Sequence, residues 1–143
     1  MRVRWVLASL LAAGLAAAGA APIDSSRLTV RVTGLRSDQG RVAIAIFDSS
    51  GAFESRANPL RSALLPVQGS SCEWVVEDLP AGEYAVMLYH DTNDNGKLDK
   101  KSFGMPKEPY GFSNNARAPL GPPPFEAARF ELADDVTLEI EAR

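Results

Sequence analysis

Hydrophobic and polar residues alternate along most of the chain, in short runs separated by turn residues. In 27-RLTVRVTGL-35, for example, Leu28, Val30 and Val32 share one face, and the residues between them are polar. This period of two is typical of a β-strand with one buried face. The same reasoning predicts seven strands, at 27–35, 41–48, 60–67, 72–77, 83–90, 125–132 and 136–141.

Seven short strands at regular spacing predict an all-β fold, a single antiparallel β-sandwich of seven or eight strands. The run 41-RVAIAIFD-48 is apolar on both faces, which is typical of a strand that is covered on both sides. A short helical turn is expected within 49–57, where Phe53 can reach the core. Trp74 alternates with Val76, so we expect it between the sheets.

One segment, from Asp91 to about Pro124, shows no strand pattern. Loops longer than about 12–15 residues are uncommon in compact domains and are often functional. Apolar residues occur along the whole segment: Phe103, Met105, Tyr110, Phe112 and Leu120. We therefore predict one long ordered loop that packs onto the sandwich.

The first twenty residues resemble a secretory signal peptide. Arg2 and Arg4 precede an apolar run of about 15 residues, and residues 18–20 read Ala-Gly-Ala, the small-x-small pattern of a signal-peptidase site. The run is shorter than the roughly 20 residues that span a bilayer. We expect cleavage after Ala20, a mature domain of residues 21–143 in the periplasm or outside the cell, and no membrane span after cleavage. The alternative is a retained membrane anchor.

The mature domain is mildly acidic and holds one cysteine. Removal of Arg2 and Arg4 leaves 13 basic against 18 acidic residues, a net charge of −5. The sequence shows no basic cluster, which argues against nucleic acid as a partner. Cys72 has no partner for an internal disulfide, so stability must come from the core or from a metal. We interpret Cys72 as a small buried hydrophobic residue.

The stretch 90-HDTNDNGKLD-99 matches the D-x-[DN]-x-[DN]-G pattern of a calcium loop. Calcium binds six to eight oxygens, and side chains at alternate positions of a tight curl converge on one point. Gly96 permits the sharp turn. The candidate ligands are the side chains of Asp91, Asn93, Asn95 and Asp99 and the backbone carbonyl of Lys97.

This loop departs from the pattern at position 12, where Ser102 stands in place of the usual Glu. Only Asp91 and Asp99 bring charge, so the Kd for calcium should be weak, about 10⁻⁴ to 10⁻³ M, unless Glu108 folds in. The alternative is a polar turn, in which the Asp and Asn side chains bond nearby backbone. The sequence leaves both interpretations open, and calcium is the only cofactor it indicates.

Several short motifs follow one another between residues 90 and 130: His-Asp, the Asn-rich loop, Gly-x-Pro-x-Glu, Tyr-Gly-Phe-Ser-Asn-Asn and Gly-Pro-Pro-x-Phe. This combination resembles the exported bacterial proteins grouped as domain of unknown function 2141, over nearly the whole mature chain. The resemblance implies an exported domain but no activity, because none is assigned to the family. The stretch 78-DLPAGEYAV-86 is also similar to the LP-x-G-x-Y-x-V strand of transthyretin-like sandwiches.

The sequence does not favour an enzyme. His90 is the only histidine, and it shares a strand face with Leu88, which suits a residue at the edge of the core. Asp91 lies on the opposite face, where it cannot orient His90 as a triad acid. One His and one Cys are too few for a catalytic zinc site, which usually takes three protein ligands. A hydrolase that uses His90 is the second alternative to a non-catalytic role.

The segment 108-EPYGFSNNARAPLGPPPF-125 mixes aromatic side chains with planar polar groups, which suits a sugar or peptide ligand. Its candidate binding residues are Tyr110, Phe112, Asn114, Asn115 and Arg117. The alternative is that the polar groups bond the backbone of their own loop. We expect an exported, non-catalytic module of the cell envelope with an unknown envelope ligand or protein as partner. A carbohydrate- or peptide-binding protein is the first alternative.

Overall fold

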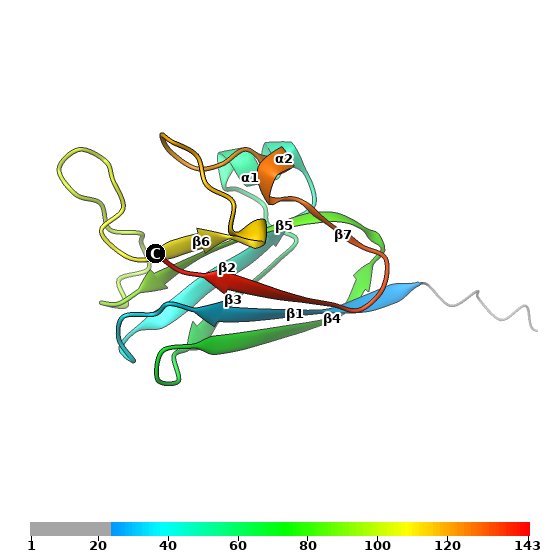
Figure 1. Ribbon diagram of the computed structural model, residues 1–143, viewed down its shortest axis with the longest axis horizontal. Helices are drawn as coiled ribbons and strands as arrows, with labels where there is room; N and C mark the ends of the chain where they lie inside the picture. Colours follow the sequence, from blue (N-terminus) through cyan, green and yellow to red (C-terminus); the bar gives the residue numbers. More distant parts are fainter. Residues whose placement is uncertain (1–23) are drawn as a thin grey trace, which may run out of the picture.

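Eight strands in two facing sheets form the framework of the part of the chain that the computed structural model describes, residues 24–143 (Figure 1). The smaller sheet has the order β4-β1-β8 and the larger the order β3-β2-β5-β6, with β7 paired to the start of β5. The strands are β1 Ser25–Thr33, β2 Arg41–Phe47, β3 Arg61–Pro66, β4 Cys72–Pro80, β5 Gly82–Asp91, β6 Tyr110–Phe112, β7 Phe130–Leu132 and β8 Val136–Glu141. The all-β sandwich predicted from the sequence is confirmed.

Three short helical elements lie outside the sheets: α1 Ser50–Ser55, the 3₁₀ turn η1 Ser113–Asn115 and α2 Phe125–Ala128. The helical turn expected within 49–57 is α1, capped by the Ser49 hydroxyl, which accepts a hydrogen bond from the amide of Ala52. Within residues 24–143 no helix has the length and apolar character needed to cross a membrane. The expected signal peptide and its cleavage site lie outside the described residues.

The pairing of β1 with β8 is parallel, with Val30 opposite Leu138, so the sandwich is not purely antiparallel. Alternation of apolar residues determines which face of a strand is buried, and it is the same for both strand directions. For that reason the sequence pattern could not distinguish a parallel from an antiparallel partner.

The single strand predicted at 125–132 is wrong. Its first half is α2, and only β7 pairs with β5. Phe125 and Ala128 are both buried, and their spacing of three places them on one face of a helical turn. Pro124 precedes that turn in extended conformation. Proline is tolerated at the start of a helix because the backbone N–H that it lacks would have no partner within the helix there.

The strand β6 was not predicted, because it is only three residues long and has glycine at its centre. A Cβ atom on Gly111 would lie 2.8 Å from Cγ2 of Ile140. The glycine therefore lets β6 approach β8 closely. Tyr110 and Arg143 exchange two backbone hydrogen bonds of 3.0 Å, which join the larger sheet to the end of the chain.

The core fills the space between the sheets. Its fully buried members include Leu28, Val30 and Val32 from β1, Val42, Ile44 and Ile46 from β2, Val86 and Leu88 from β5, and Ile140 from β8. Trp74 and Cys72 pack against this core, but both are only half-buried, unlike Val76 and Leu79 on the same strand. Burial raises the pKa of the Cys72 thiol to about 11, so at neutral pH it is not a thiolate.

A second, aromatic cluster lies on the outer face of the larger sheet, beneath the neighbouring helices α1 and α2 (Figure 1). The Phe53 ring is at its centre, with ring centroids 5.7 Å from Phe47, 6.0 Å from Phe112 and 5.8 Å from Phe125. Edge-to-face contacts of this kind are favourable beyond the area that they bury. This cluster covers one end of the outer face and leaves the other end open.

Candidate functional site

The open end of this outer face is the floor of a trough. The register of β2 with β3 and β5, and of β5 with β6, sets two rows of side chains across it. The rows are Leu64, Ala43, Tyr89 and Tyr110, and Ser62, Ala45, Met87 and Phe112. Alanine is depleted in strands, and here two alanines lie in the middle with larger side chains on either side. The small residues give the trough its depth.

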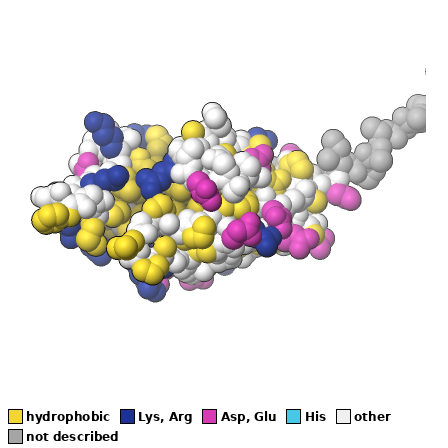
Figure 2. Space-filling model, turned by 90° about the horizontal axis from the view of Figure 1, so that it is seen from above, with side chains coloured by type: hydrophobic (Ala, Val, Ile, Leu, Met, Phe, Trp, Pro, Cys, Tyr) yellow, Lys and Arg dark blue, Asp and Glu magenta, His cyan; other side chains and the backbone are white. Residues whose placement is uncertain are grey.

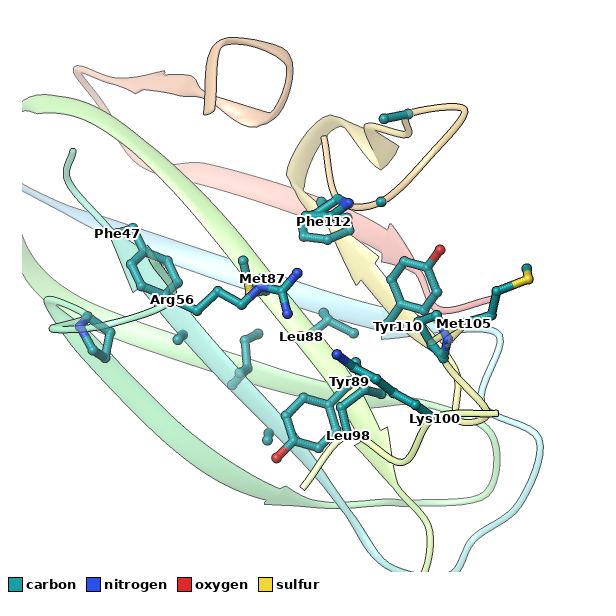
Figure 3. Close-up of a pocket in the computed structure, with 18 of the residues that line it drawn as sticks. Phe47, Arg56, Met87, Leu88, Tyr89, Leu98, Lys100, Met105, Tyr110 and Phe112 are labelled. Atoms are coloured by element: carbon teal, nitrogen blue, oxygen red, sulfur yellow. The ribbon is translucent and has the colours of Figure 1, made fainter. Parts of the chain in front are cut away.

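Two loop segments form the walls of the trough, which encloses about 930 Å³ (Figure 3). One wall is part of the chain after β5, with Leu98 and Met105, and the other is 118–122. The trough is lined mainly by apolar side chains, and its volume lies within the range of about 300–1,000 Å³ usual for small-molecule sites. We call this feature, the two floor rows with the two wall segments, the apolar trough.

The rims of the apolar trough expose large apolar side chains. Phe103 is 96% exposed, Leu120 92% and Met105 66%. Phe103 lies at the tip of a tight backbone turn. In this turn the amide of Lys101 donates a hydrogen bond to the carbonyl of Met105 (2.7 Å), and the amide of Gly104 donates one to the carbonyl of Lys101 (2.9 Å). The loop is therefore ordered by its own backbone and still presents Phe103 to solvent. Large exposed apolar side chains that line one trough are typical of a binding site.

Two of the five predicted ligand residues, Tyr110 and Phe112, line the apolar trough. The amide of Asn114 donates to the carbonyl of Arg129 (2.7 Å), and Asn115 accepts a hydrogen bond from the amide of Glu141 (2.9 Å). These two asparagines hold the loop to neighbouring strands and are not among the lining residues. Arg117 lies over the ring of Tyr110, 5.6 Å from its centroid.

The residues that sequence reasoning missed are those of the floor and walls, above all Ala43, Ala45, Met87, Tyr89 and Leu98. A signal was present in the two-sided apolar pattern of 41–48, which predicted a second covered face. On this strand the helices cover Phe47, and Ala45 packs against the aromatic cluster beneath them, while Ala43 and Ala45 also line the open trough.

The Asx-rich loop brings three of the five candidate calcium ligands together, the side chains of Asn93, Asn95 and Asp99. Asp91 is buried at the end of β5, and its two carboxylate oxygens accept hydrogen bonds from the amides of Asn95 (3.1 Å) and Gly96 (2.7 Å). The side-chain amides of Asn93 and Asn95 donate to the carboxylate of Asp99 at 2.6 and 2.9 Å. Hydrogen bonds from Asn95 and then Asn93 lower the pKa of Asp99 below its usual value.

The hydrogen bonds of Lys97, Asp94 and Glu108 show which other groups of this loop could act as metal ligands. The amide of Lys97 donates to Asn95 Oδ1 (3.0 Å), and Asp94 points away to pair with Arg41 (2.7 Å). Glu108 is 5% exposed. Its carboxylate accepts hydrogen bonds from the backbone amides of Thr92 and Asp99, both at 3.0 Å. It braces the loop backbone and does not join the side chains of the candidate ligands.

In the part of the chain that the structure describes, no three His, Cys, Asp or Glu side chains are grouped to hold a metal. The Asx-rich loop has a different composition, with two carboxylates, two amides and one carbonyl. A site there would depend on neutral oxygens for most of its ligands, which fits a hard cation such as calcium better than a transition metal.

His90 is fully buried and faces inward with Tyr84, Val86 and Leu88. Its Nε2 lies 2.7 Å from the carbonyl of Gln39, and its Nδ1 has no partner within residues 24–143. Gly40 closes the hairpin loop over this end of β5, since a Cβ there would lie 1.9 Å from the carbonyl oxygen of Asp91. Within residues 24–143 the imidazole therefore has no exposed surface.

Fold and site together define a β-sandwich domain with an open apolar trough on one sheet. The family model described as "Uncharacterized protein conserved in bacteria (DUF2141)" matches residues 30–139, and the chain belongs to this family. No curated protein and no solved structure matches the chain. The likeness of 78–86 to transthyretin-like sandwiches is therefore not confirmed.

Proposed function

We propose that this domain is an exported, non-catalytic module of the bacterial cell envelope that binds an apolar ligand in the apolar trough. The observation that carries the proposal is the apolar floor beneath rims that expose Phe103 and Leu120. Burying one such side chain stabilises a complex by about 1.5–3 kcal/mol. A ligand that lies on the floor and covers the rims would gain this free energy.

The chemistry of the lining favours an apolar ligand over a carbohydrate. Sugar sites combine aromatic faces with several free polar groups that fix the hydroxyls. Here Asn114 and Asn115 already bond backbone atoms, and the uncharged polar side chains in the lining are those of Ser62, Tyr89 and Tyr110. An extended apolar molecule fits this surface better.

The composition of the apolar trough also favours binding without catalysis. Among the described residues, its lining includes no His, Cys, Asp or Glu, and the groups there that could transfer a proton are those of Lys100, Tyr89 and Tyr110. His90 is on the opposite, inner face of β5.

Export is supported by the basic start and the apolar run of residues 1–20. N-terminal sequencing of the protein from its native envelope should give Ala21 as the first residue. A chain that retains Trp5 to Gly19 would contradict export by cleavage and favour an anchored form.

The binding proposal is tested by titration with a neutral fluorescent apolar probe, N-phenyl-1-naphthylamine. The wild type should bind it saturably. Ala45→Trp fills the floor and should weaken binding by about tenfold or more. Val75→Trp is the matched control, because Val75 is exposed on the outer face of the smaller sheet. Absence of saturable binding, or equal loss in both variants, would contradict the proposal.

The Asx-rich loop is the second candidate site, for a weak calcium ion. Three side chains, of Asn93, Asn95 and Asp99, already meet within hydrogen-bond distance. A half-turn of the Asn93 amide exchanges its nitrogen for its oxygen and directs that oxygen towards Asp99. The same turn at Asn95 would also require the loop to release the hydrogen bond from the Lys97 amide to Asn95 Oδ1. Each Asp91 oxygen accepts one backbone hydrogen bond and has a further lone pair. Because Glu108 is engaged with the loop backbone, it does not supply the missing bidentate ligand.

A further inference from the structure

Two cationic side chains extend over the apolar floor of the trough. Arg56 reaches in from the end of α1 and Lys100 from the chain after β5, and Figure 3 shows both directed towards the middle. Neither belongs to an ion pair within residues 24–143, although five other arginines there do. Among the residues that the structure describes, no acidic one lines the trough. Two like charges thus face an apolar surface without a counter-charge from the described chain.

The backbone at Arg56 gives a second indication that its side chain has a function. Arg56 is the C-cap of α1, with φ 54° and ψ 34°, in the left-handed region. This conformation favours glycine, because any Cβ is crowded there. An arginine that occupies such a position is a reason to look for a role for its side chain.

The distribution of charge over the molecule agrees with this indication. The full chain has a net charge of −3. Figure 2 shows Lys and Arg gathered, among hydrophobic side chains, towards the end that carries the long loop, while Asp and Glu gather towards the opposite end. On the face that Figure 2 shows, basic side chains therefore lie nearer to the wall loop than most of the acidic ones do, which favours an anion there.

We propose that the ligand of the apolar trough is an amphipathic carboxylate, an apolar chain that ends in one carboxylate group. The chain lies on Ala43, Ala45 and Met87, and the carboxylate lies between Arg56 and Lys100. This inference rests on the binding function proposed above and adds the charge of the ligand. Guanidinium groups bind carboxylates through paired, charge-assisted hydrogen bonds, and an apolar surrounding strengthens them. A neutral or cationic ligand would gain no attraction from either cation.

The test compares three ligands with the same twelve-carbon chain: dodecanoate, dodecanol and dodecyltrimethylammonium. Each displaces N-phenyl-1-naphthylamine from the full domain, below the concentration at which it forms micelles. Dodecanoate should bind about tenfold tighter than dodecanol, and the ammonium compound weakest. The double variant Arg56→Gln/Lys100→Gln should reduce dodecanoate to the affinity of dodecanol and leave dodecanol unchanged. Arg36→Gln/Lys107→Gln, outside the lining, is the charge-matched control.

Arg56→Gly separates a binding role from a structural one. It should melt at the wild-type temperature or above, because glycine suits the left-handed backbone, and it should lose part of the preference for dodecanoate. A lower melting temperature together with an unchanged preference would overturn the role of Arg56.

The other outcomes distinguish this inference from the proposed function. Equal affinity for dodecanoate and dodecanol would overturn the charge inference and leave apolar binding intact. Failure of all three ligands would overturn both. A stable dimer in light scattering that excludes the probe would assign the trough to a second copy of the chain, and that too would overturn both.

Discussion

The outer faces of the two sheets both meet solvent but carry different side chains. On the smaller sheet, Arg27 pairs with Glu77 at 2.7 Å and Arg31 with Glu73 at 2.9 Å across the β1–β4 ladder. On the larger sheet, the corresponding positions of β2 at the open end are Ala43 and Ala45, with no charged neighbour in the two floor rows. Cross-strand ion pairs are the usual content of a solvated face.

We interpret the outer face of the smaller sheet as a solvated surface and that of the larger sheet as a surface for a ligand. The strands of both sheets bury their inner residues in one core, so the inner faces are alike. The outer face of the smaller sheet needs no cover. That of the larger sheet is covered by α1 and α2 at one end, and at the other end its apolar residues remain accessible. The open end is where the molecule has surface that binding can still bury.

The largest expected effect comes from comparing the two faces of the larger sheet. Ile44→Ala, on the inner face, should lower the free energy of unfolding by about 2–5 kcal/mol, because it leaves a cavity in the core. Met87→Ala, on the outer face, should cost clearly less, since its side chain is half-buried. Urea unfolding of both variants measures this. Equal losses would show that the outer face is part of the stabilising core.

A smaller effect is expected from calcium, which would act at the base of one trough wall. Calcium at ten times its Kd should raise the free energy of unfolding by about 1.4 kcal/mol, because the ion binds only the folded loop. Asp91→Ala and Asp99→Ala should each abolish the shift in melting temperature.

The control for calcium is Asp94→Ala, because Asp94 pairs with Arg41 and points away from the candidate ligands. It should leave the shift unchanged, and EDTA should reverse the shift. If protein freed of metal melts identically with excess calcium and with EDTA, the loop is a polar turn only.

The smallest effect is expected on the charged face. Breaking the pair with Arg31→Ala should change stability by about 0–1 kcal/mol, because both partners are more than 45% exposed and exposed pairs are weak. Added salt should remove most of the difference. Binding in the apolar trough should not change, as measured by the neutral probe. A loss of binding would couple the two sheets and contradict their separate roles.

The strands could be predicted from the sequence because the signal is local. Alternation within β1 or β2 fixes which residues face the core, and those residues are buried. The burial of Trp74 was less predictable. The face is right, but the depth differs along β4, because Val76 is buried and Trp74 is only half-buried. Alternation alone does not predict the depth of Trp74. Its replacement by Ala should therefore cost less than the roughly 3–5 kcal/mol of a fully buried Trp.

The site was harder to predict because it depends on register and on contacts between distant segments. Arg56 and Lys100 are far apart in the sequence, so no basic cluster was visible there, yet the fold brings both to one trough. Asn114 and Asn115 have chemistry that suits a ligand and backbone equally well. Their partners, Arg129 and Glu141, are known only once the strands are placed.

The most direct test of the ligand face is an NMR titration of the isotope-labelled domain with dodecanoate. Chemical-shift changes should concentrate on Ala43, Ala45, Met87 and Phe103, all of which line the apolar trough. Thr29, Arg31 and Val75, on the outer face of the smaller sheet, should not move. Changes on the smaller sheet, or no changes at saturating dodecanoate, would contradict the assignment of the larger sheet's open end as a ligand site.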